Sequence, residues 1–281
     1  MFYKTEAVSN GRAVPMYKSD LLSGVPHGFA TRKGGVSAGE FTQSMNFAFG
    51  RGDSDDTVIK NFEIFARAVG ADPACGVMLG QIHSSDILCV NRESFGMGVY
   101  RKSDLCLDGY VSDTPGALLC VRVADCVPIL FFDKTAGVIG AVHAGWRGSA
   151  AKIAVRCVEE MEKLGASREN ITAAIGPSIC RSCYTVGEDF RDECIRLLGG
   201  EMCKKFIKVG FDGVLHADLK LVNKLLLQNA GIKDENIDVS NICTSCNPDE
   251  FFSHRRHKNN RGTLCAMISL PKECGKDKIN D

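Results

Sequence analysis

The segment ALLCVRVADCVPILFFDKTAGVIGAVHAG, Ala117–Gly145, decides the fold of this 281-residue chain. It contains three apolar runs, which are Ala117–Cys126, Val127–Asp133 and Gly137–Gly145. Runs this rich in Val, Ile and Leu are typical of strands that are covered on both faces. The turn at Lys134–Ala136 is short enough for a hairpin, so we expect the last two runs to pair antiparallel.

Strands and helices alternate on both sides of this segment. We expect, in chain order, helix Asp55–Val69, strand Gly76–His83, helix Gly148–Gly165, strand Ile171–Ile179, helices Gly187–Leu198 and Ala217–Ala230, and strands Ile237–Ile242 and Thr263–Leu270. The first fifty residues are rich in glycine and lack a sustained apolar period, which predicts loops. Helical crossovers and hairpin-length turns together predict an α/β fold with mixed sheets. No repeat or linker divides the chain, so we expect one domain over 1–271 and a polar tail over 272–281.

The composition excludes several classes of protein. A content of 44% hydrophobic and 24% charged residues is typical of a globular chain and not of a disordered one. The 34 basic residues are balanced by 34 acidic ones, whereas proteins that bind nucleic-acid polymers usually carry a basic excess. The short basic run His254–Arg261 is long enough to bind one small anion.

The cysteines and the apolar runs indicate a cytoplasmic location. The chain has fourteen cysteines, but its first residues contain no apolar signal segment. No run approaches the roughly 18 apolar residues of a membrane helix. We therefore expect reduced thiols and no membrane association. The pairs Cys180/Cys183 and Cys243/Cys246 lie too far apart in sequence for a common zinc ribbon, which favours unligated thiols over a second zinc or a redox pair.

Three side chains capable of binding a metal close predicted strands, namely His83, Cys126 and His143. The ends of buried strands are where α/β folds place their chemistry. Two imidazoles and one thiolate form a zinc site with one open position, which lowers the pKa of bound water or polarises a substrate oxygen. Asp125, beside the cysteine, is a candidate supporting group or base. Each residue alone also fits an ordinary structural role.

Seven motifs resemble the YfiH-type family, whose members are also called laccase-domain or polyphenol oxidase-like proteins. They are HGFATRKGGVSAGEF, SMNFAFGRGDSDD, GQIHSSD, RVADCVPILFFD, AVHAGWRGSAAKI, IGPSICRSCYTVGEDF and FFSHRRHKNNRG, and the resemblance as a whole extends from about His27 to Met267. The sequence departs from the family pattern at Cys180 and Arg181, where relatives read G-P-C-C-Y. It also departs at Gly50, where a histidine is frequent.

The resemblance implies a layered α/β/β/α fold, with His83, Cys126 and His143 as metal ligands. It implies zinc-dependent phosphorolysis of adenosine, inosine and methylthioadenosine, and deamination of adenosine. A bacterial branch of the family is linked to editing of peptidoglycan precursors. The family is also labelled as multicopper oxidases, but three ligands cannot build a mononuclear plus a trinuclear copper set, so zinc is favoured over copper.

Phosphorolysis also needs an anion site near the sugar. Arg32, Arg147 and Arg255 are candidates, because guanidinium groups bind phosphate through two parallel hydrogen bonds. Asn46 is a candidate for a ribose hydroxyl or base edge, or an ordinary turn residue. Trp146, the single tryptophan, suits either base stacking or packing.

The sequence therefore predicts a zinc-dependent purine nucleoside phosphorylase and adenosine deaminase, with a nucleoside and phosphate as its partners and a monomer or homodimer as its assembly. Several alternatives remain. One is a hydrolase in which Cys126 is a nucleophile activated by His143, without metal catalysis. The others are a peptidoglycan-precursor editing enzyme, a non-catalytic zinc protein and, last, a copper oxidase.

Overall fold

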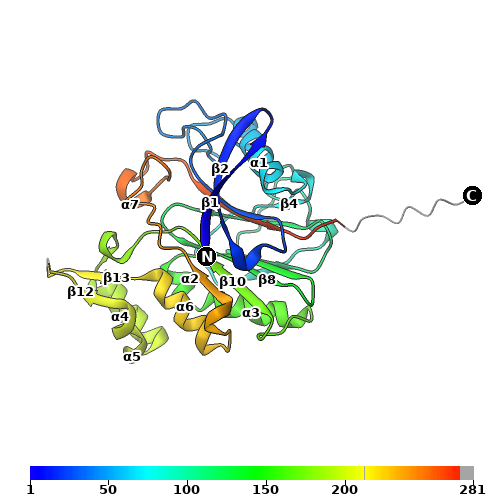
Figure 1. Ribbon diagram of the computed structural model, residues 1–281. Coiled ribbons are helices and arrows are strands. Elements are labelled where there is room, and N and C mark those ends of the chain that lie inside the picture. Colours follow the sequence, from blue (N-terminus) through cyan, green and yellow to red (C-terminus); the bar gives the residue numbers. More distant parts are fainter. Residues whose placement is uncertain (212, 273–281) are drawn as a thin grey trace, which may run out of the picture.

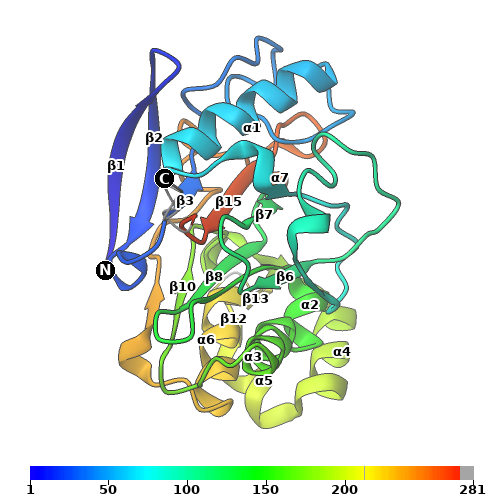
Figure 2. The same cartoon turned by 90° about the vertical axis from the view of Figure 1, so that its right-hand side faces the viewer.

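The computed structural model of the chain describes residues 1–211 and 213–272 (Figure 1). Two six-stranded mixed sheets stack face to face, and helices cover their outer faces. The first sheet contains, in spatial order, β1 (Phe2–Ser9), β2 (Arg12–Ser19), β3 (His27–Ala30), β15 (Leu264–Ser269), β7 (Leu118–Val123) and β4 (Gly76–Val77). Figure 2 shows β15 between β3 and β7 in the middle of this sheet.

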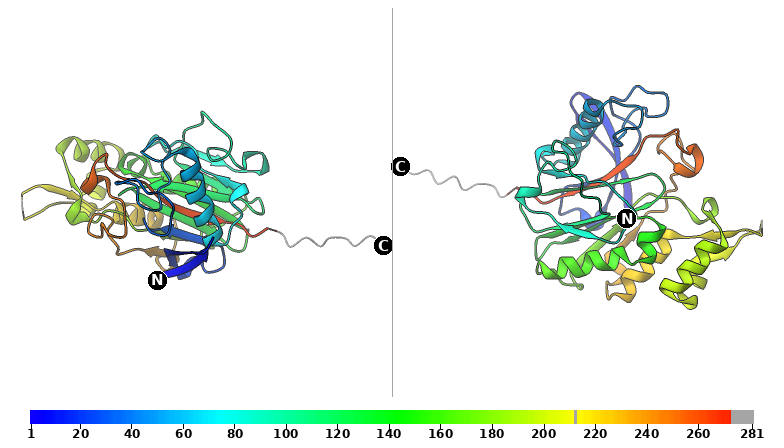
Figure 3. Two further views of the ribbon diagram at one scale, coloured as in Figure 1. Left: turned by 90° about the horizontal axis from the view of Figure 1, so that it is seen from above. Right: turned by 180° about the vertical axis from the view of Figure 1, so that it is seen from behind.

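The second sheet contains, in spatial order, β14 (Ile237–Val239), β10 (Ile171–Ile175), β8 (Val127–Asp133), β9 (Val138–Ala144), β6 (Gly109–Ser112) and β5 (Ile87–Cys89). A small third sheet contains β11 (Thr185–Val186), β13 (Leu215–Ala217) and β12 (Ile207–Val209). The helices are α1 (Asp55–Val69), α2 (Trp146–Ala150), α3 (Ile153–Lys163), α4 (Glu188–Leu198), α5 (Gly200–Phe206), α6 (Leu219–Asn229) and α7 (His254–His257). Figure 3 shows α1 on one side of the stacked sheets and α3 to α6 on the other.

Three hydrophobic cores separate the four layers. Leu118 of β7 packs in the core beneath α1, while its neighbour Leu119 packs in the core between the sheets. In β8, Leu130 faces the first sheet and Phe131 faces the helices on the outer side. Successive side chains of a strand point to opposite faces, so only a strand covered on both sides is apolar throughout. The predicted α/β/β/α layering with mixed sheets is confirmed.

Local sequence explains the hairpin of β8 and β9. The two strands pair antiparallel from Val127 opposite Ala144 to Asp133 opposite Val138. The Asp133 carboxylate accepts hydrogen bonds from the backbone amides of Thr135 and Ala136, at 2.8 and 3.0 Å. An aspartate that binds the amides following it is a common turn former. The expected hairpin is therefore confirmed.

The prediction for α1 is confirmed at both ends. The Ser54 hydroxyl accepts a hydrogen bond from the Thr57 amide, and Gly70 ends the helix in the left-handed conformation. Phe62 and Phe65 pack with Met16 and Met267 of the first sheet.

The prediction of loops over the first fifty residues holds for residues 31–50, which contain no helix or strand, but is wrong for the residues before them. They contain β1, β2 and β3, and the first two form a hairpin around Asn10 and Gly11, which both have positive φ. An Asn-Gly pair is the preferred turn of a two-residue hairpin, so the sequence did contain this information. Half of the residues of β1, an edge strand, are exposed, and its sequence FYKTEAVS lacks the regular apolar alternation that identifies a strand.

Two further predictions need correction. The helix expected over Gly148–Gly165 begins earlier, at Trp146, and is broken at Lys152, whose φ of 61° is left-handed. Ser149 therefore lies inside α2, where its hydroxyl accepts a hydrogen bond from the Asn223 side chain. The strand expected over Gly76–His83 ends at Val77, and the rest of that segment is a loop. Apart from Lys272, the tail expected over 272–281 lies outside the described residues.

Acid is expected to destabilise the fold through His27. This side chain is 2% exposed, accepts a hydrogen bond from the Ser19 amide and interacts with the Val25 carbonyl. Burial lowers its pKa from 6.5 to about 4. The unfolded chain then binds the proton first, so up to about 3 kcal/mol of unfolding free energy is lost as the pH falls from about 6.5 to about 4.

Denaturant unfolding of wild type and His27→Gln across this range tests the expectation. The stability advantage of wild type should be greatest near neutral pH and should shrink as the pH falls. A constant difference between the two proteins would contradict the assignment.

Among the described residues, none of the helices is both long and apolar enough to cross a bilayer.

Candidate active site

His83, Cys126 and His143 meet at one end of the second sheet. Their ligand atoms all lie within 4.8 Å of one another. His143 lies near the end of β9, and Cys126 immediately precedes β8, the antiparallel neighbour of β9. The expectation that all three residues close strands is corrected for His83, which lies in a loop with a φ of 61°, and for Cys126, which follows the end of β7 at Val123.

The loops that carry His83 and Cys126 both pass from the first sheet to the second. The chain leaves β4, passes through His83 and enters β5, and it leaves β7, passes through Cys126 and enters β8. Two of the three ligands are therefore held by crossover loops, and the third is held by a central strand. The site lies where the chain crosses twice from the first sheet to the second. These two crossings fix the positions of the ligands relative to both sheets.

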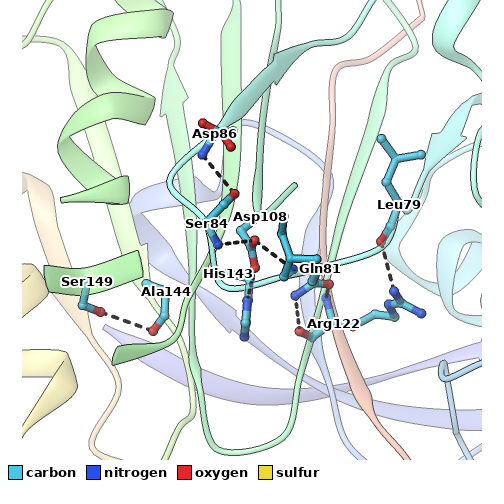
Figure 4. Close-up of polar contacts among 10 residues, drawn as sticks. Leu79, Gln81, Ser84, Asp86, Asp108, Arg122, His143, Ala144 and Ser149 are labelled. Carbon is cyan, nitrogen blue, oxygen red and sulfur yellow. Dashed lines mark hydrogen bonds and ion pairs between the residues drawn. The ribbon is translucent and has the colours of Figure 1, made fainter. Parts of the chain in front are cut away.

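Asp108, immediately before β6, contacts the His143 ring and the backbone on either side of His83; Figure 4 shows its contacts with His143 and Ser84. Its Oδ1 lies 2.7 Å from Nδ1 of His143. Its Oδ2 accepts hydrogen bonds from the amides of Ile82 and Ser84, the residues on either side of His83, at 3.1 and 2.7 Å. Asp108 is fully buried, so one carboxylate orients the His143 ring and also holds the His83 loop in place.

The His83 loop is anchored to the first sheet as well (Figure 4). The side chain of Gln81 donates to the carbonyl of Arg122 and accepts from its amide, at 2.9 and 2.8 Å. The Arg122 guanidinium in turn donates to the carbonyl of Leu79 at 3.0 Å. The Gln81 side chain therefore makes the two hydrogen bonds to the Arg122 backbone that a neighbouring strand would otherwise make.

The donor groups fit a metal ion with an open coordination position. The hydrogen bond to Asp108 leaves Nε2 of His143 free to bind a metal, and the two imidazole rings lie edge to face at 4.8 Å. Burial lowers the pKa of His143, but the negative charges of Cys126 and Asp108 outweigh this and raise it to about 9. The same negative charges favour a bound cation.

Gly145 leaves room for this cluster. A Cβ atom at this position would lie 2.4 Å from Nδ1 of His83 and 3.3 Å from the Cys126 sulfur. A side chain here would collide with two of the ligands, so the site depends on glycine at this turn.

Two cavities flank the cluster. A cavity of about 240 Å³ includes the side chains of Arg51, Arg122 and Arg261 in its lining. A second, of about 340 Å³, is lined by Trp146, Tyr184, Arg147, Arg255 and Asp125, among others. His83, Cys126 and Arg261 line both. We call them the arginine cavity and the aromatic cavity, and the metal ligands lie at their junction.

The structure brings together only some of the residues suggested for substrate binding. Arg147 and Arg255 line the aromatic cavity, whereas Arg32 and Asn46 line neither cavity. The Arg32 guanidinium donates to the carbonyls of Gln43 and Pro248 and stacks on a phenylalanine ring. Asn46 is fully buried and hydrogen-bonds to the Asp53 carboxylate and the Thr263 amide.

Trp146 packs against another aromatic residue and also lines a cavity. Its ring packs against Phe190 with centroids 5.2 Å apart, and it also lines the aromatic cavity. The Arg147 guanidinium lies over the same ring, 4.2 Å from its centroid.

Asp125 is held by internal hydrogen bonds. Its carboxylate accepts from the hydroxyls of Thr244 and Ser253 and from the Arg255 amide, at 2.6, 2.9 and 2.6 Å. These donors all belong to the segment before and within α7. Asp125 therefore fixes that segment against the cavity walls.

Sequence reasoning missed Asp108, Gln81 and the arginines of the arginine cavity. Asp108 directly precedes a buried strand that was not predicted, so its position beside the histidines was not evident. Arg261 lies in the basic run before β15, and its proximity to the ligands comes from the fold alone.

The family model described as "Multi-copper polyphenol oxidoreductase laccase" matches residues 26–271. The chain belongs to this family. The resemblance seen in the sequence motifs is thereby confirmed. This laccase-family chain is 38% identical to a protein of Deinococcus radiodurans named purine nucleoside phosphorylase, over 93% of this chain and 95% of the relative. It is 32% identical to a protein of an unknown prokaryotic organism named adenosine deaminase RL5, over 85% and 92% of the two chains.

Solved structures agree with the family assignment. The fold of this laccase-family protein matches the crystal structure of YlmD from Geobacillus stearothermophilus with a TM-score of 0.84, at 31% identity, over 96% of this chain and 99% of that chain. The hypothetical protein YfiH from Bacillus licheniformis matches with the same TM-score at 34% identity, over 91% and 96% of the two chains.

Proposed function

We propose that this protein is a zinc-dependent purine nucleoside enzyme that phosphorolyses purine nucleosides and deaminates adenosine. The observation that carries the proposal is the set of three metal donors at the junction of an aromatic and an arginine-lined cavity. Relatives named purine nucleoside phosphorylase and adenosine deaminase support a purine nucleoside as substrate. Cytoplasmic location and a monomer or homodimer remain part of the proposal.

Zinc is the metal that the donor set favours. Two imidazoles, one thiolate and one open position are typical of catalytic zinc. A blue-copper centre uses the same three donors with a distant axial methionine, glutamine or carbonyl. No methionine lines either cavity among the described residues, and His83 is exposed to solvent. A zinc ion held here supplies Lewis-acid chemistry at a position that faces both cavities.

The aromatic cavity suits the nucleoside. Trp146 and Tyr184 offer faces on which a purine stacks, and Arg147 stiffens the Trp146 ring from one side. Arg255 donates to the carbonyls of Cys183 and Thr185. We therefore assign it the role of holding the cavity wall in place, and not of binding the nucleoside.

The arginine cavity suits phosphate. Arg51, Arg122 and Arg261 place three positive charges beside the metal ligands. The Arg261 guanidinium donates to the Gly262 carbonyl and the Thr263 hydroxyl through Nη1, which holds its positive charge at the cavity. In this arrangement phosphate approaches the ribose from one cavity while the purine lies in the other, which positions the reacting groups.

We assign Asp125 a positioning role, because three internal donors occupy its carboxylate. Cys126 is assigned as a ligand. The order Cys126, His143 and Asp108 also matches the nucleophile, base and orienting acid of a cysteine hydrolase, which is the second candidate function. His83 has no part in such a triad, and its approach to both other ligands favours the metal.

The experiment combines metal analysis of the purified protein with product analysis after incubation with adenosine, with and without phosphate. Zinc, together with inosine or with adenine and ribose-1-phosphate, supports the proposal and shows which reaction dominates. Activity that survives complete chelation would favour the cysteine hydrolase. Zinc without any nucleoside product would move the search to peptidoglycan precursors.

Substitutions in the two cavities are expected to affect the binding of different substrates. Arg261→Gln is expected to raise the KM for phosphate by about 10- to 100-fold, because a charge-assisted hydrogen bond to phosphate is worth about 1.5–3 kcal/mol. Adenosine deamination needs no phosphate, so it should lose less activity than phosphorolysis, although Arg261 lines both cavities. Arg147→Gln, the matched change in the aromatic cavity, should instead raise the KM for the nucleoside in both reactions. Steady-state kinetics of both variants decide this, and equal losses in both reactions for Arg261→Gln would indicate a structural role.

A further inference from the structure

The fold brings together the two C-x-x-C pairs that lie far apart in the sequence. The sulfurs of Cys180, Cys183, Cys243 and Cys246 all lie within 4.8 Å of one another, and those of Cys183 and Cys246 are 3.4 Å apart. All four are free thiols. The sequence distance that argued against a shared site therefore does not separate them in space.

Parallel pairing explains the meeting. The first pair follows β10 and the second follows β14, and these strands are parallel neighbours in the second sheet. Parallel strands end at the same edge, so the loops that follow them emerge side by side. A bridge between Ser178 and Cys243 extends this pairing into the loops.

The backbone holds the sulfurs as a metal site requires. Cys180 and Cys183 are joined by a tight turn, in which the Cys183 amide donates to the Cys180 carbonyl at 3.1 Å. The Cys180 amide donates to the sulfur of Cys243 across the two loops at 3.2 Å. Amide donors to sulfur stabilise the thiolate form, which is the form that binds metals.

We propose that these four cysteines bind a second, structural zinc ion. A tetrahedral site with Zn–S bonds of about 2.3 Å places its sulfurs about 3.8 Å apart, close to the spacing found here. Four protein ligands leave no open position, so the site has no catalytic role. The proposal does not depend on the nucleoside activity or on the metal at His83, Cys126 and His143.

Two basic side chains, Lys220 and Arg256, contact the loop that carries the second cysteine pair, which favours a negatively charged cluster. Zinc bound by four thiolates carries a net charge of about −2. Lys220 is 7% exposed, donates to the carbonyls of Ser240 and Ile242, and interacts electrostatically with Cys243 and Cys180. Arg256 donates to the carbonyl of Ser245, inside the second C-x-x-C turn.

The zinc would clamp the wall of the aromatic cavity. Tyr184, which lines that cavity, directly follows the first pair, and Arg255 donates to the carbonyl of Cys183. Thr244, between the cysteines of the second pair, donates to Asp125. A zinc ion bound by the four cysteines would therefore fix the two loops that carry them, and these loops contact Asp125 and Arg255 of the candidate active site.

Zinc content of the full chain and three variants tests the proposal. Wild type is expected to hold about two zinc ions per chain, one for each cluster. Cys246→Ser should lose one ion, and Cys126→Ala should lose the other. Cys89→Ser, which changes another exposed cysteine outside both clusters, should keep both. Cys246 is exposed, so its replacement should leave the fold intact, and Cys246→His should restore zinc binding.

Each outcome is informative. The proposal is overturned if Cys246→Ser holds as much zinc as wild type, or if the four cysteines form disulfides and bind no zinc. If the active-site metal assignment is the one that fails, wild type holds a single zinc that Cys246→Ser removes and Cys126→Ala does not. Cobalt substitution gives an independent signature, because four thiolates produce much stronger sulfur-to-metal absorption than the single thiolate of Cys126.

Discussion

Replacing Cys126 with alanine is expected to remove the metal of the candidate active site and reduce kcat/KM for nucleosides by at least about 1,000-fold. Lewis-acid stabilisation of a transition state is worth several kcal/mol, and about 4 kcal/mol corresponds to this factor. The two remaining imidazoles form too small a donor set to retain zinc at chelator concentrations that wild type withstands. Cys126 is only half-buried, so the fold should survive the change.

Metal analysis and nucleoside kinetics on the purified variant measure both effects. Cys89→Ser is the matched control, because it also removes one thiol but lies on β5, outside both cysteine-containing clusters. Unchanged metal content with lost activity would contradict the ligand assignment and identify Cys126 as a nucleophile.

Asp108→Asn is expected to weaken metal binding by about 10- to 100-fold, the usual effect of losing the partner of a ligating histidine. The carboxylate accepts from His143 and from the amides of Ile82 and Ser84. An asparagine of the same shape has one acceptor oxygen, and its NH2 group faces a donor on one side or the other. Either the His143 ring or the His83 loop then loses its support.

Chelator competition measures the zinc affinity of this variant. Asp86→Asn is the control, since it makes the same substitution at an exposed position of the same loop region. A thermal midpoint near that of wild type together with weaker zinc binding would separate positioning from general destabilisation. Equal zinc affinity in both variants would show that Asp108 does not orient a ligand.

The sequence was most informative where local chemistry determines the structure. The cap at Ser54, the left-handed Gly70 and the apolar runs of β8 and β9 predicted those elements correctly. The edge strand β1 was missed because half of its residues are exposed and its sequence FYKTEAVS lacks a regular apolar alternation. The break at Lys152 was missed because lysine is a good helix former and no glycine or proline marks the position.

In the candidate site, too, some residues were identifiable from the sequence and others only from the fold. His83, Cys126 and His143 were identified because metal-binding residue types in family motifs are visible in the sequence, and the structure brings them together. Asp108 and Arg261 were missed because their relation to these residues arises from strand order. Arg32 and Asn46 were chosen by residue type, but the structure uses both to hold loops.

The place of β15 in the first sheet has a consequence for biosynthesis. This strand pairs with β3 on one side and β7 on the other, yet at least 263 residues are made before its first one. At about 5–20 residues per second, β3 waits about 10 to 50 s for its partner after it has been synthesised. During that time the edge of β3 that later pairs with β15 is unpaired, and so is the matching edge of β7 once β7 has been made. Unpaired strand edges bind other chains. Until its central strand is made, the nascent chain therefore presents two unpaired edges at which other chains can bind.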